Sequence, residues 1–271
     1  MEKIQAALEK ARSRRASGEP SADVQPAGRP QKTRRGGKTS LWTNLKEIEL
    51  SGKALAEHNV VTRQASQKAT PFDILRTKVL LQMRQNGWKS IAITSPMPQS
   101  GKTTMACNLA LGLGRQGELN TILFDLDLQD PSVGDFLAHS PEHDITEMLS
   151  GTVPFADQAV RVGPSVAVSM ANRSESDPTR VLLADQTRET LDAVQESYDP
   201  DIMIFDTPSI LVGDNTRAFL KNVDCALIVA RANSTKYGHF DACEREVAEY
   251  TNVLGVVLNA IRTTSIENAI E

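Results

Sequence analysis

The sequence predicts an α/β protein with a doubly wound, mainly parallel β-sheet. Short apolar runs rich in Ile, Val and Leu alternate with amphipathic stretches along most of the chain. Because these runs lack the polar alternation of a half-exposed strand, we expect helices to bury them on both faces. The expected strands are 90–94, 121–126, 166–170, 201–205, 226–230 and 254–258, and the expected helices are 102–116, 179–197, 214–222 and 236–250.

The chain before this pattern has a different composition. Residues 2–15 have the apolar spacing of a short helix with basic residues at its end. Residues 16–40 are rich in Gly, Pro, Ser, Lys and Arg, so we expect a disordered linker. Trp42 and Leu45 could pack on the body of the fold or merely connect to it. We therefore expect a basic N-terminal helix with its linker, a connecting segment and a main domain, at 1–40, 41–69 and 70–271.

The net charge of −4 hides an asymmetry between the N-terminal arm, residues 1–40, and the rest. The arm has ten Lys and Arg against four acids, whereas the other residues have 20 Lys and Arg against 30 acids. A basic arm on an acidic body predicts contact with an anionic surface, which could be lipid headgroups or nucleic acid. The alternative is a solvated tail without a partner.

Composition also bears on the compartment. Mean hydropathy is −0.30, and no apolar run approaches the roughly 18 residues that cross a bilayer. The N-terminal residues are polar, so we expect no secretory signal. Cys107, Cys225 and Cys243 are far apart and have no histidine at ligand spacing, so we expect buried hydrophobic residues rather than a disulfide or zinc site. These features favour a cytoplasmic protein.

The first expected strand runs into a loop typical of phosphate binding. Its last residues are Gly-Lys-Thr, directly before an expected helix. In such a P-loop, backbone N–H groups bind phosphates, Lys102 contacts the β- and γ-phosphate oxygens and Thr103 binds Mg²⁺. Pro96 stands where the pattern usually begins with glycine, and the alternative is a turn that contains the tripeptide by accident. The expected nucleotide-binding residues of the loop are Pro98, Gln99, Ser100, Gly101, Lys102, Thr103 and Thr104.

Carboxylates follow two of the other expected strands. Asp125 and Asp127 end the strand 121–126, and Asp206 ends the strand 201–205. Buried acids are costly unless they meet a cation or a proton, and ligands of doubly wound sheets bind at this edge. An apolar strand that ends in Asp is typical of the Walker B motif, which holds Mg²⁺. The alternative is that each acid caps a helix.

With these motifs the chain resembles the bacterial tyrosine kinases (BY-kinases) of capsule and exopolysaccharide machinery, which are P-loop NTPases with a deviant Walker A loop. The resemblance covers about residues 70–262. It is carried by the Walker A loop Thr94–Thr103, the Walker A′ motif Asp125-Leu126-Asp127 and the Walker B motif Asp206-Thr207-Pro208. Further similar positions are Asp177-Pro178, Asp214, Gly255–Asn259 and, in some members, Ile4–Ala11.

The resemblance implies ATP and Mg²⁺ as cofactors and roles for the matching residues. Lys102 would contact the β- and γ-phosphates, Asp125 would accept the proton of the attacking hydroxyl, and Asn259 would lie near the adenine. The implied catalytic residues are Lys102, Asp125, Asp127 and Asp206, and the implied metal ligands are Thr103, Asp127 and Asp206.

The resemblance also implies partners. A separate membrane polysaccharide co-polymerase would activate the chain, which would regulate polysaccharide synthesis or export. The arm would then lie against the anionic inner face of the plasma membrane. A homo-oligomer is compatible with this hypothesis, and no specific nucleic acid is expected.

Four departures from the family pattern bear on activity. Gln99 replaces a loop glycine, so a backbone angle that only glycine adopts cheaply could be strained. Gln129 replaces an arginine after the Walker A′ acids, and the ExxRxxR helix that members use between subunits survives in part, at Arg76. The C-terminus has no tyrosine cluster, so we predict ATPase activity with little or no tail autophosphorylation.

Two other functions fit parts of the pattern. A partitioning or division-site ATPase of the same superfamily would carry a signature lysine near the start of the loop, where this chain has Pro96-Met97-Pro98-Gln99. A non-catalytic regulator would bind nucleotide without turning it over, and Gln99 and Gln129 are compatible with that alternative.

Overall fold

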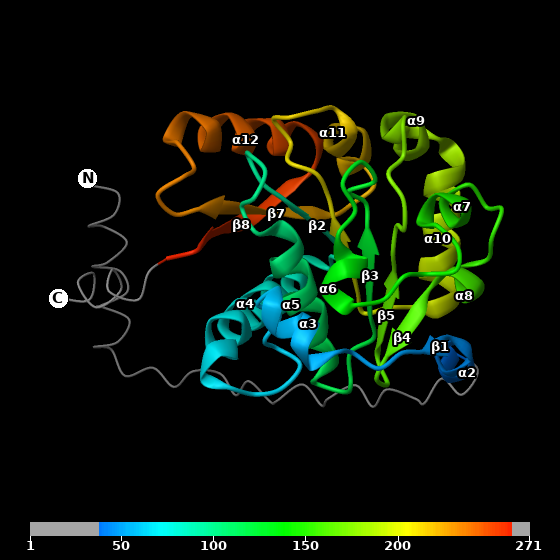
Figure 1. Ribbon diagram of the computed structural model, residues 1–271. Helices are drawn as coiled ribbons and strands as arrows, with labels where there is room; N and C mark the ends of the chain where they lie inside the picture. The colour runs from blue at the N-terminus through cyan, green and yellow to red at the C-terminus, as the bar shows by residue number, and fades with distance from the viewer. Residues whose placement is uncertain (1–37, 262–271) are drawn as a thin grey trace, which may run out of the picture. The chain divides into compact units, whose positions relative to one another are not determined.

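A computed structural model describes residues 38–261 as one β-sheet covered by helices on both faces (Figure 1). Within this range eight strands lie in the order β1-β4-β5-β3-β6-β2-β7-β8. Neighbouring strands are parallel except for β4 and β5, which confirms the mainly parallel sheet. The strands are β1 (Lys46–Glu47), β2 (Ser90–Thr94), β3 (Thr121–Asp125), β4 (Val160–Val162), β5 (Val166–Ser169), β6 (Ile202–Asp206), β7 (Cys225–Arg231) and β8 (Asn252–Asn259).

The helices bury two separate apolar layers against the sheet. One layer includes residues of α3, α4 and α5, and the other includes residues of α10, α11 and α12. The fold is therefore doubly wound, as the sequence predicts. The helices are α2 (Lys38–Asn44), α3 (Gly52–Glu57), α4 (Thr70–Asn86), α5 (Lys102–Gly114), α6 (Val133–Leu137), α7 (Ile145–Leu149), α8 (Phe155–Gln158), α9 (Pro178–Leu183), α10 (Asp185–Tyr198), α11 (Asn215–Leu220) and α12 (Tyr237–Tyr250), with a 3₁₀ turn η1 (Gln67–Ala69).

The six expected strands are present as β2, β3, β5, β6, β7 and β8. The expectation that helices bury both faces of each strand is wrong for β8. This strand is the edge of the sheet, and the side chains of Val256 and Leu258 are 45% and 54% exposed. An Ile/Val/Leu-rich run predicts a strand, but its place in the sheet depends on tertiary pairing.

The expected helix 179–197 is two helices. Ala184 has an extended backbone, with φ −63° and ψ 135°, and it separates α9 from α10. The break is stabilised by Thr187, whose hydroxyl donates to the carbonyl of Val181 at 2.7 Å. The strands β1 and β4 and the short helices α2, α3, α6, α7 and α8 are not predicted from the sequence, because elements of two to seven residues show little periodicity.

The connecting segment packs on the body of the fold rather than only linking to it. Trp42 and Leu45 are 3% and 2% exposed. The indole Nε1 of Trp42 donates to the carbonyl of Tyr198 at 2.9 Å, and the two rings meet edge to face. Beyond Leu45, β1 pairs with β4 at the other edge of the sheet.

The expected helix 2–15 and most of the linker lie outside the described residues, as does the C-terminal stretch 262–271. No helix in the described part is both long enough and apolar enough to cross a membrane. Cys107, Cys225 and Cys243 are buried, as the sequence predicts.

Candidate functional site

The loop between β2 and α5 is held in a fixed shape by its own serines. The hydroxyls of Ser95 and Ser100 both donate to the carbonyl of Met97, at 2.8 and 2.7 Å. Gln99 and Gly101 both have left-handed backbone angles, with φ values of 59° and 90°. At Gly101 a Cβ atom would also collide with the amide nitrogen of Asn259, so this position requires glycine.

Helix α5 begins at Lys102, and no side chain caps its N-terminus. Its first backbone N–H groups lack acceptors within the helix, and the helix dipole adds positive potential there, so this end suits an anion such as phosphate. The loop and the helix start therefore have the P-loop arrangement that the sequence predicts.

Lys102 points from the helix toward the acids of the neighbouring strands. Its ammonium lies 4.0 Å from a carboxylate oxygen of Asp127 and 3.4 Å from the hydroxyl of Ser209. The side chain is 10% exposed, so its charge is poorly screened by water. This places the cation between the loop and the ends of β3 and β6.

Asp125 and Asp206 are adjacent at the ends of β3 and β6. They are register partners in the parallel ladder, and neither is exposed. One oxygen of Asp125 accepts the N–H of Val133 at 3.0 Å. Its other oxygen and both oxygens of Asp206 have no hydrogen-bond partner among the described residues.

The electrostatics of this pair follow from burial. Burial raises the pKa of Asp206 to about 7, although the Lys102 charge acts in the opposite direction. Burial first, and then the charge of Asp206, raises the pKa of Asp125 well above its ordinary value. Burial also raises the pKa of Asp127, against the effect of Lys102. Three carboxylates are thus held where ionisation is unfavourable without a further cation.

These acids fit a hard divalent cation such as Mg²⁺. Orphaned, buried carboxylate oxygens are the ligands that Mg²⁺ prefers, and the hydroxyl of Thr103 lies at the same edge, 3.2 Å from the hydroxyl of Ser132. Among residues 38–261, no group of three or more His, Cys, Asp or Glu side chains is arranged to enclose a metal.

A cavity of about 440 Å³ opens beside the P-loop, the start of α5 and Asp127. Of the predicted nucleotide-binding residues, Pro98, Gln99, Gly101, Lys102, Thr103 and Thr104 line it, together with Asp127. Ser100 does not line it, because its side chain is turned to the loop carbonyl of Met97. Asp125 and Asp206 are not part of the lining either; they are fully buried.

Asn259 also lies outside the cavity lining. Its amide nitrogen donates to the carbonyl of Ser100 at 2.9 Å, so it contacts the outer side of the loop. Sequence reasoning missed other residues that line the cavity. Pro208, Ser209 and Gln129 were within reach of prediction, because they lie in or directly after the Walker B and Walker A′ motifs, whereas the other missed residues carry no local signal. The missed residues are Gln129, Asp130, Ser132, Phe136, Pro208, Ser209, Val212, Gly213, Asn215 and Thr216.

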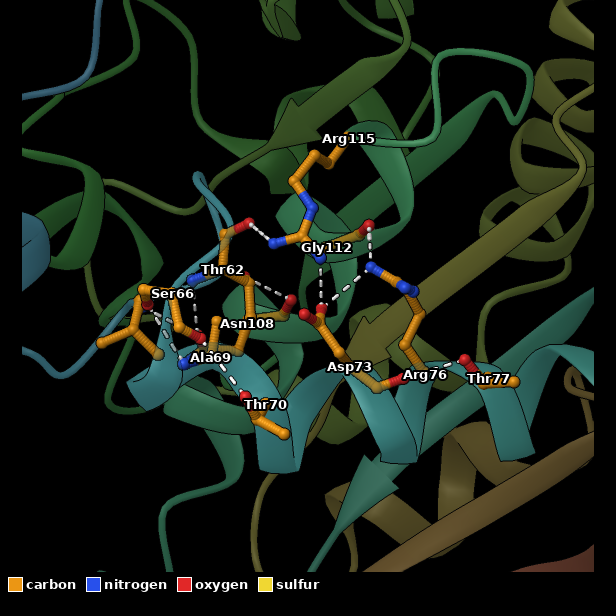
Figure 2. A network of polar contacts seen from close by, with 11 residues as sticks. Thr62, Ser66, Ala69, Thr70, Asp73, Arg76, Thr77, Asn108, Gly112 and Arg115 are labelled. Atoms are coloured by element: carbon orange, nitrogen blue, oxygen red, sulfur yellow. Dashed lines mark hydrogen bonds and ion pairs between the residues drawn. The ribbon is translucent and has the colours of Figure 1, made fainter.

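A polar network anchors α5 to the segment before α4 (Figure 2). The side chain of Asn108, on α5, accepts the N–H groups of Val61 and Thr62, at 2.8 and 3.2 Å. It also donates to the carbonyls of Asn59 and Thr104, at 3.0 and 2.8 Å. A buried amide that satisfies four backbone groups fixes the helix that carries Lys102 and Thr103.

Arg76 belongs to the same network. Its guanidinium donates to Asp73 at 2.9 Å and to the carbonyl of Gly112, on α5, at 3.0 Å (Figure 2). Arg115 reaches the same carboxylate of Asp73 from the end of α5. The one arginine left from the expected intersubunit motif is therefore engaged within the chain, where it ties α4 to α5.

Residues 91–271 match the family model described as the CobQ/CobB/MinD/ParA nucleotide binding domain. The tyrosine-protein kinase CpsD of Streptococcus agalactiae is 26% identical over 202 residues, which cover 73% of this chain and 85% of CpsD. The tyrosine-protein kinase etk of Escherichia coli is 26% identical over 190 residues, which cover 69% of this chain but 26% of etk.

Solved structures have the same fold. The kinase domain of Escherichia coli ETK superposes with a TM-score of 0.67 at 23% identity, covering 74% of this chain and 78% of that domain. Cobyrinic acid a,c-diamide synthase from Mycobacterium smegmatis, solved with a bound ATP analogue and magnesium, superposes with a TM-score of 0.55 at 23% identity. That match covers 68% of this chain and 78% of the synthase. The resemblance and the fold inferred from the sequence motifs are confirmed.

Proposed function

The chain belongs to the CobQ/CobB/MinD/ParA nucleotide-binding domain family, and from its similarity to the tyrosine-protein kinases CpsD and etk we propose that it is a Mg²⁺-dependent ATPase and phosphotransferase of the BY-kinase type. The observation that carries this proposal is the pair of buried acids beside the P-loop. Three of their four oxygens lack partners among the described residues, and Lys102 is directed toward the same strand ends. Burying ionised carboxylates without partners costs free energy, and a cation bound to the phosphates would offset that cost.

Each residue has a role in the proposed reaction. The γ-phosphoryl group passes from the β-phosphate oxygen of ATP to the oxygen of an acceptor hydroxyl, and the proton of that hydroxyl goes to a carboxylate of the acid cluster. Asp127 lines the cavity, whereas Asp125, the base that the resemblance implies, is fully buried and would accept the proton only after the site opens. Lys102 stabilises the charge that develops on the transferred group. Thr103, Asp127 and Asp206 are the residues that would hold Mg²⁺, which neutralises charge on the phosphate oxygens when bound. With water as acceptor the products are ADP and phosphate; with tyrosine they are ADP and phosphotyrosine.

We assign the acceptor tyrosine to another protein. Tyr198 is 6% exposed and its carbonyl accepts the indole N–H of Trp42, so its hydroxyl cannot reach a γ-phosphate without local unfolding. Tyr250 is half-buried beside Lys221. Tyr237 is 82% exposed at the start of α12, but transfer requires an in-line hydroxyl about 3 Å from the phosphate, which a helical residue rarely offers.

The similarity to CpsD and etk supports a place in capsule or exopolysaccharide production. In this proposal a membrane polysaccharide co-polymerase activates the chain, and the basic arm holds it at the anionic inner face of the plasma membrane. A homo-oligomer is compatible with the proposal, and we expect no specific nucleic acid as a partner.

The test combines phosphate release with phosphotyrosine mapping. The full chain is incubated with Mg-ATP alone, with Mg-ATP and a glutamate–tyrosine copolymer, and with ATP and a chelator. We expect phosphate release that depends on Mg²⁺, phosphotyrosine on the copolymer, and little on the chain itself. Phosphate release without phosphotyrosine on any acceptor would reduce the function to an ATPase. Binding of Mg-ATP without phosphate release would favour the non-catalytic regulator.

A further inference from the structure

The outer side of the P-loop is tied to the last two strands of the sheet. The guanidinium of Arg231, at the end of β7, donates to the carbonyl of Gln99 at 2.6 Å. The amide of Asn259, at the end of β8, donates to the next carbonyl, that of Ser100, at 2.9 Å. Arg231 and Asn259 are register partners in the β7–β8 ladder. Two opposite residues thus hold two consecutive loop carbonyls, and neither Arg231 nor Asn259 lines the nucleotide cavity.

The first of these carbonyls belongs to a residue in an unfavourable conformation. Gln99 has φ 59°, in the left-handed region, where a Cβ atom crowds the backbone. The chain therefore keeps the left-handed turn without the residue that adopts it most readily, and something else must stabilise it.

Arg231 is itself held in place for this contact. Its N–H donates to the hydroxyl of Thr235 at 2.8 Å, and its carbonyl accepts the N–H of Thr235 at 2.9 Å. The next residue, Ala232, donates its N–H to the carbonyl of Asn259 at 2.9 Å. The side chain is exposed and does not line the nucleotide cavity, so its contact is with the loop rather than with the cavity.

We propose that Arg231 is a positioning residue that holds the P-loop in its anion-binding shape and compensates for Gln99. A charged donor on the Gln99 carbonyl favours the left-handed turn that directs the neighbouring N–H groups toward the phosphates. A test of this proposal by nucleotide affinity rests on the proposed function, whereas a test by hydrogen exchange of the loop does not.

The first test is a double-mutant cycle on nucleotide affinity. Binding of a fluorescent ATP analogue with Mg²⁺ is measured for the parent chain, Arg231→Ala, Gln99→Gly and the double variant. Arg245→Ala, which removes an exposed arginine of α12 paired with Asp241, is the matched control. We expect about fivefold to tenfold weaker binding for Arg231→Ala than for the parent and parent-like binding for the control. Binding by the double variant should lie within about twofold of binding by Gln99→Gly alone.

Recovery is the result that separates positioning from simple charge attraction. Glycine adopts φ 59° without support, so Gln99→Gly removes the need for Arg231. If Arg231 acts only by attracting the anionic nucleotide, the double variant stays as weak as Arg231→Ala, and the proposal is wrong. Parent-like binding by Arg231→Ala would overturn it as well.

The second test uses the ligand-free chain. Hydrogen–deuterium exchange of the peptide that contains residues 97–101 should be faster in Arg231→Ala than in the parent and unchanged in Arg245→Ala. Unchanged exchange in Arg231→Ala contradicts the proposal whether or not the parent binds nucleotide. Failure of the parent to bind nucleotide, with faster loop exchange in Arg231→Ala, contradicts the proposed function and leaves the positioning role supported.

Discussion

Replacing Asp206 by asparagine should stabilise the ligand-free protein while it removes Mg²⁺-dependent activity. Asp206 is not exposed, its two oxygens lack hydrogen-bond partners in the described part of the chain, and it lies beside Asp125 in the ladder. An amide of nearly the same shape carries no charge and can donate a hydrogen bond to Asp125. The substitution therefore removes a buried charge without opening a cavity.

The expected change in the free energy of unfolding follows from the pKa of Asp206. Burial raises the pKa of Asp206 from its ordinary 3.8 to about 7. At about 1.4 kcal/mol for each tenfold change in proton affinity, the ionised carboxylate costs the folded protein up to about 4 kcal/mol at pH 8. Between about pH 4 and 7 the folded state keeps a proton that the unfolded state has released. The contribution of Asp206 to the free energy of unfolding therefore decreases as the pH rises through this window and is constant above it.

The assay is urea denaturation with a chelator present, at pH 4.5 and pH 8. We expect Asp206→Asn to raise the free energy of unfolding by about 2 to 4 kcal/mol at pH 8 and by much less at pH 4.5. Asp192→Asn, at an exposed position of α10, is the control and should change it by less than about 0.5 kcal/mol at either pH. A variant that is equally stable or less stable than the parent at pH 8 would refute the argument that the site is electrostatically strained without a cation.

Three further perturbations test other parts of the account. Deleting residues 1–37, which retains the whole described fold, should weaken co-sedimentation with anionic vesicles at low salt. Basic residues near such a surface contribute roughly 1 kcal/mol each to the free energy of binding. Equal binding by the full and the truncated chain would contradict the membrane role of the arm. Asn108→Ala should lower the free energy of unfolding by about 2 to 4 kcal/mol in urea denaturation, since it leaves buried backbone groups without partners. A loss below about 1 kcal/mol would show that the network around Asn108 is dispensable for stability. Gly101→Ala should weaken nucleotide binding at least about tenfold, because a Cβ meets the amide of Asn259 and the φ of Gly101 is 90°. Truncating Asn259 as well should restore little of the nucleotide affinity. Full recovery of the affinity would show that only the collision with Asn259 matters.

Much of the fold follows from local sequence, because its buried strands are continuous apolar runs. The strand–Gly-Lys-Thr–helix pattern predicts the loop and the start of α5 at Lys102, where the structure has them. What the sequence cannot supply is strand order. Asp125 and Asp206 are 81 positions apart in the chain, and they become neighbours because β3 pairs with β6.

The same limit applies to side chains whose role depends on a distant backbone. Nothing in the sequence around Arg231 indicates a contact with Gln99, and a buried Asn108 in α5 has no local signature. Residues 41–69 show no clear periodicity, yet Trp42 finds its partner at Tyr198, far along the chain. Such contacts are set by packing after the sheet has formed, so only the tertiary structure gives them.

The most direct test of the central claim is steady-state phosphate release from ATP by the full chain and by Lys102→Met, each with Mg²⁺ and with a chelator. Lys68→Met, at an exposed position of η1, serves as the matched control. We predict Mg²⁺-dependent release by the parent and the control, and a loss of about 10²-fold or more in Lys102→Met, because the ammonium directed at the acid cluster supplies transition-state stabilisation. A folded Lys102→Met variant that releases phosphate at the parent rate would contradict the assignment of this loop as the phosphate-binding site.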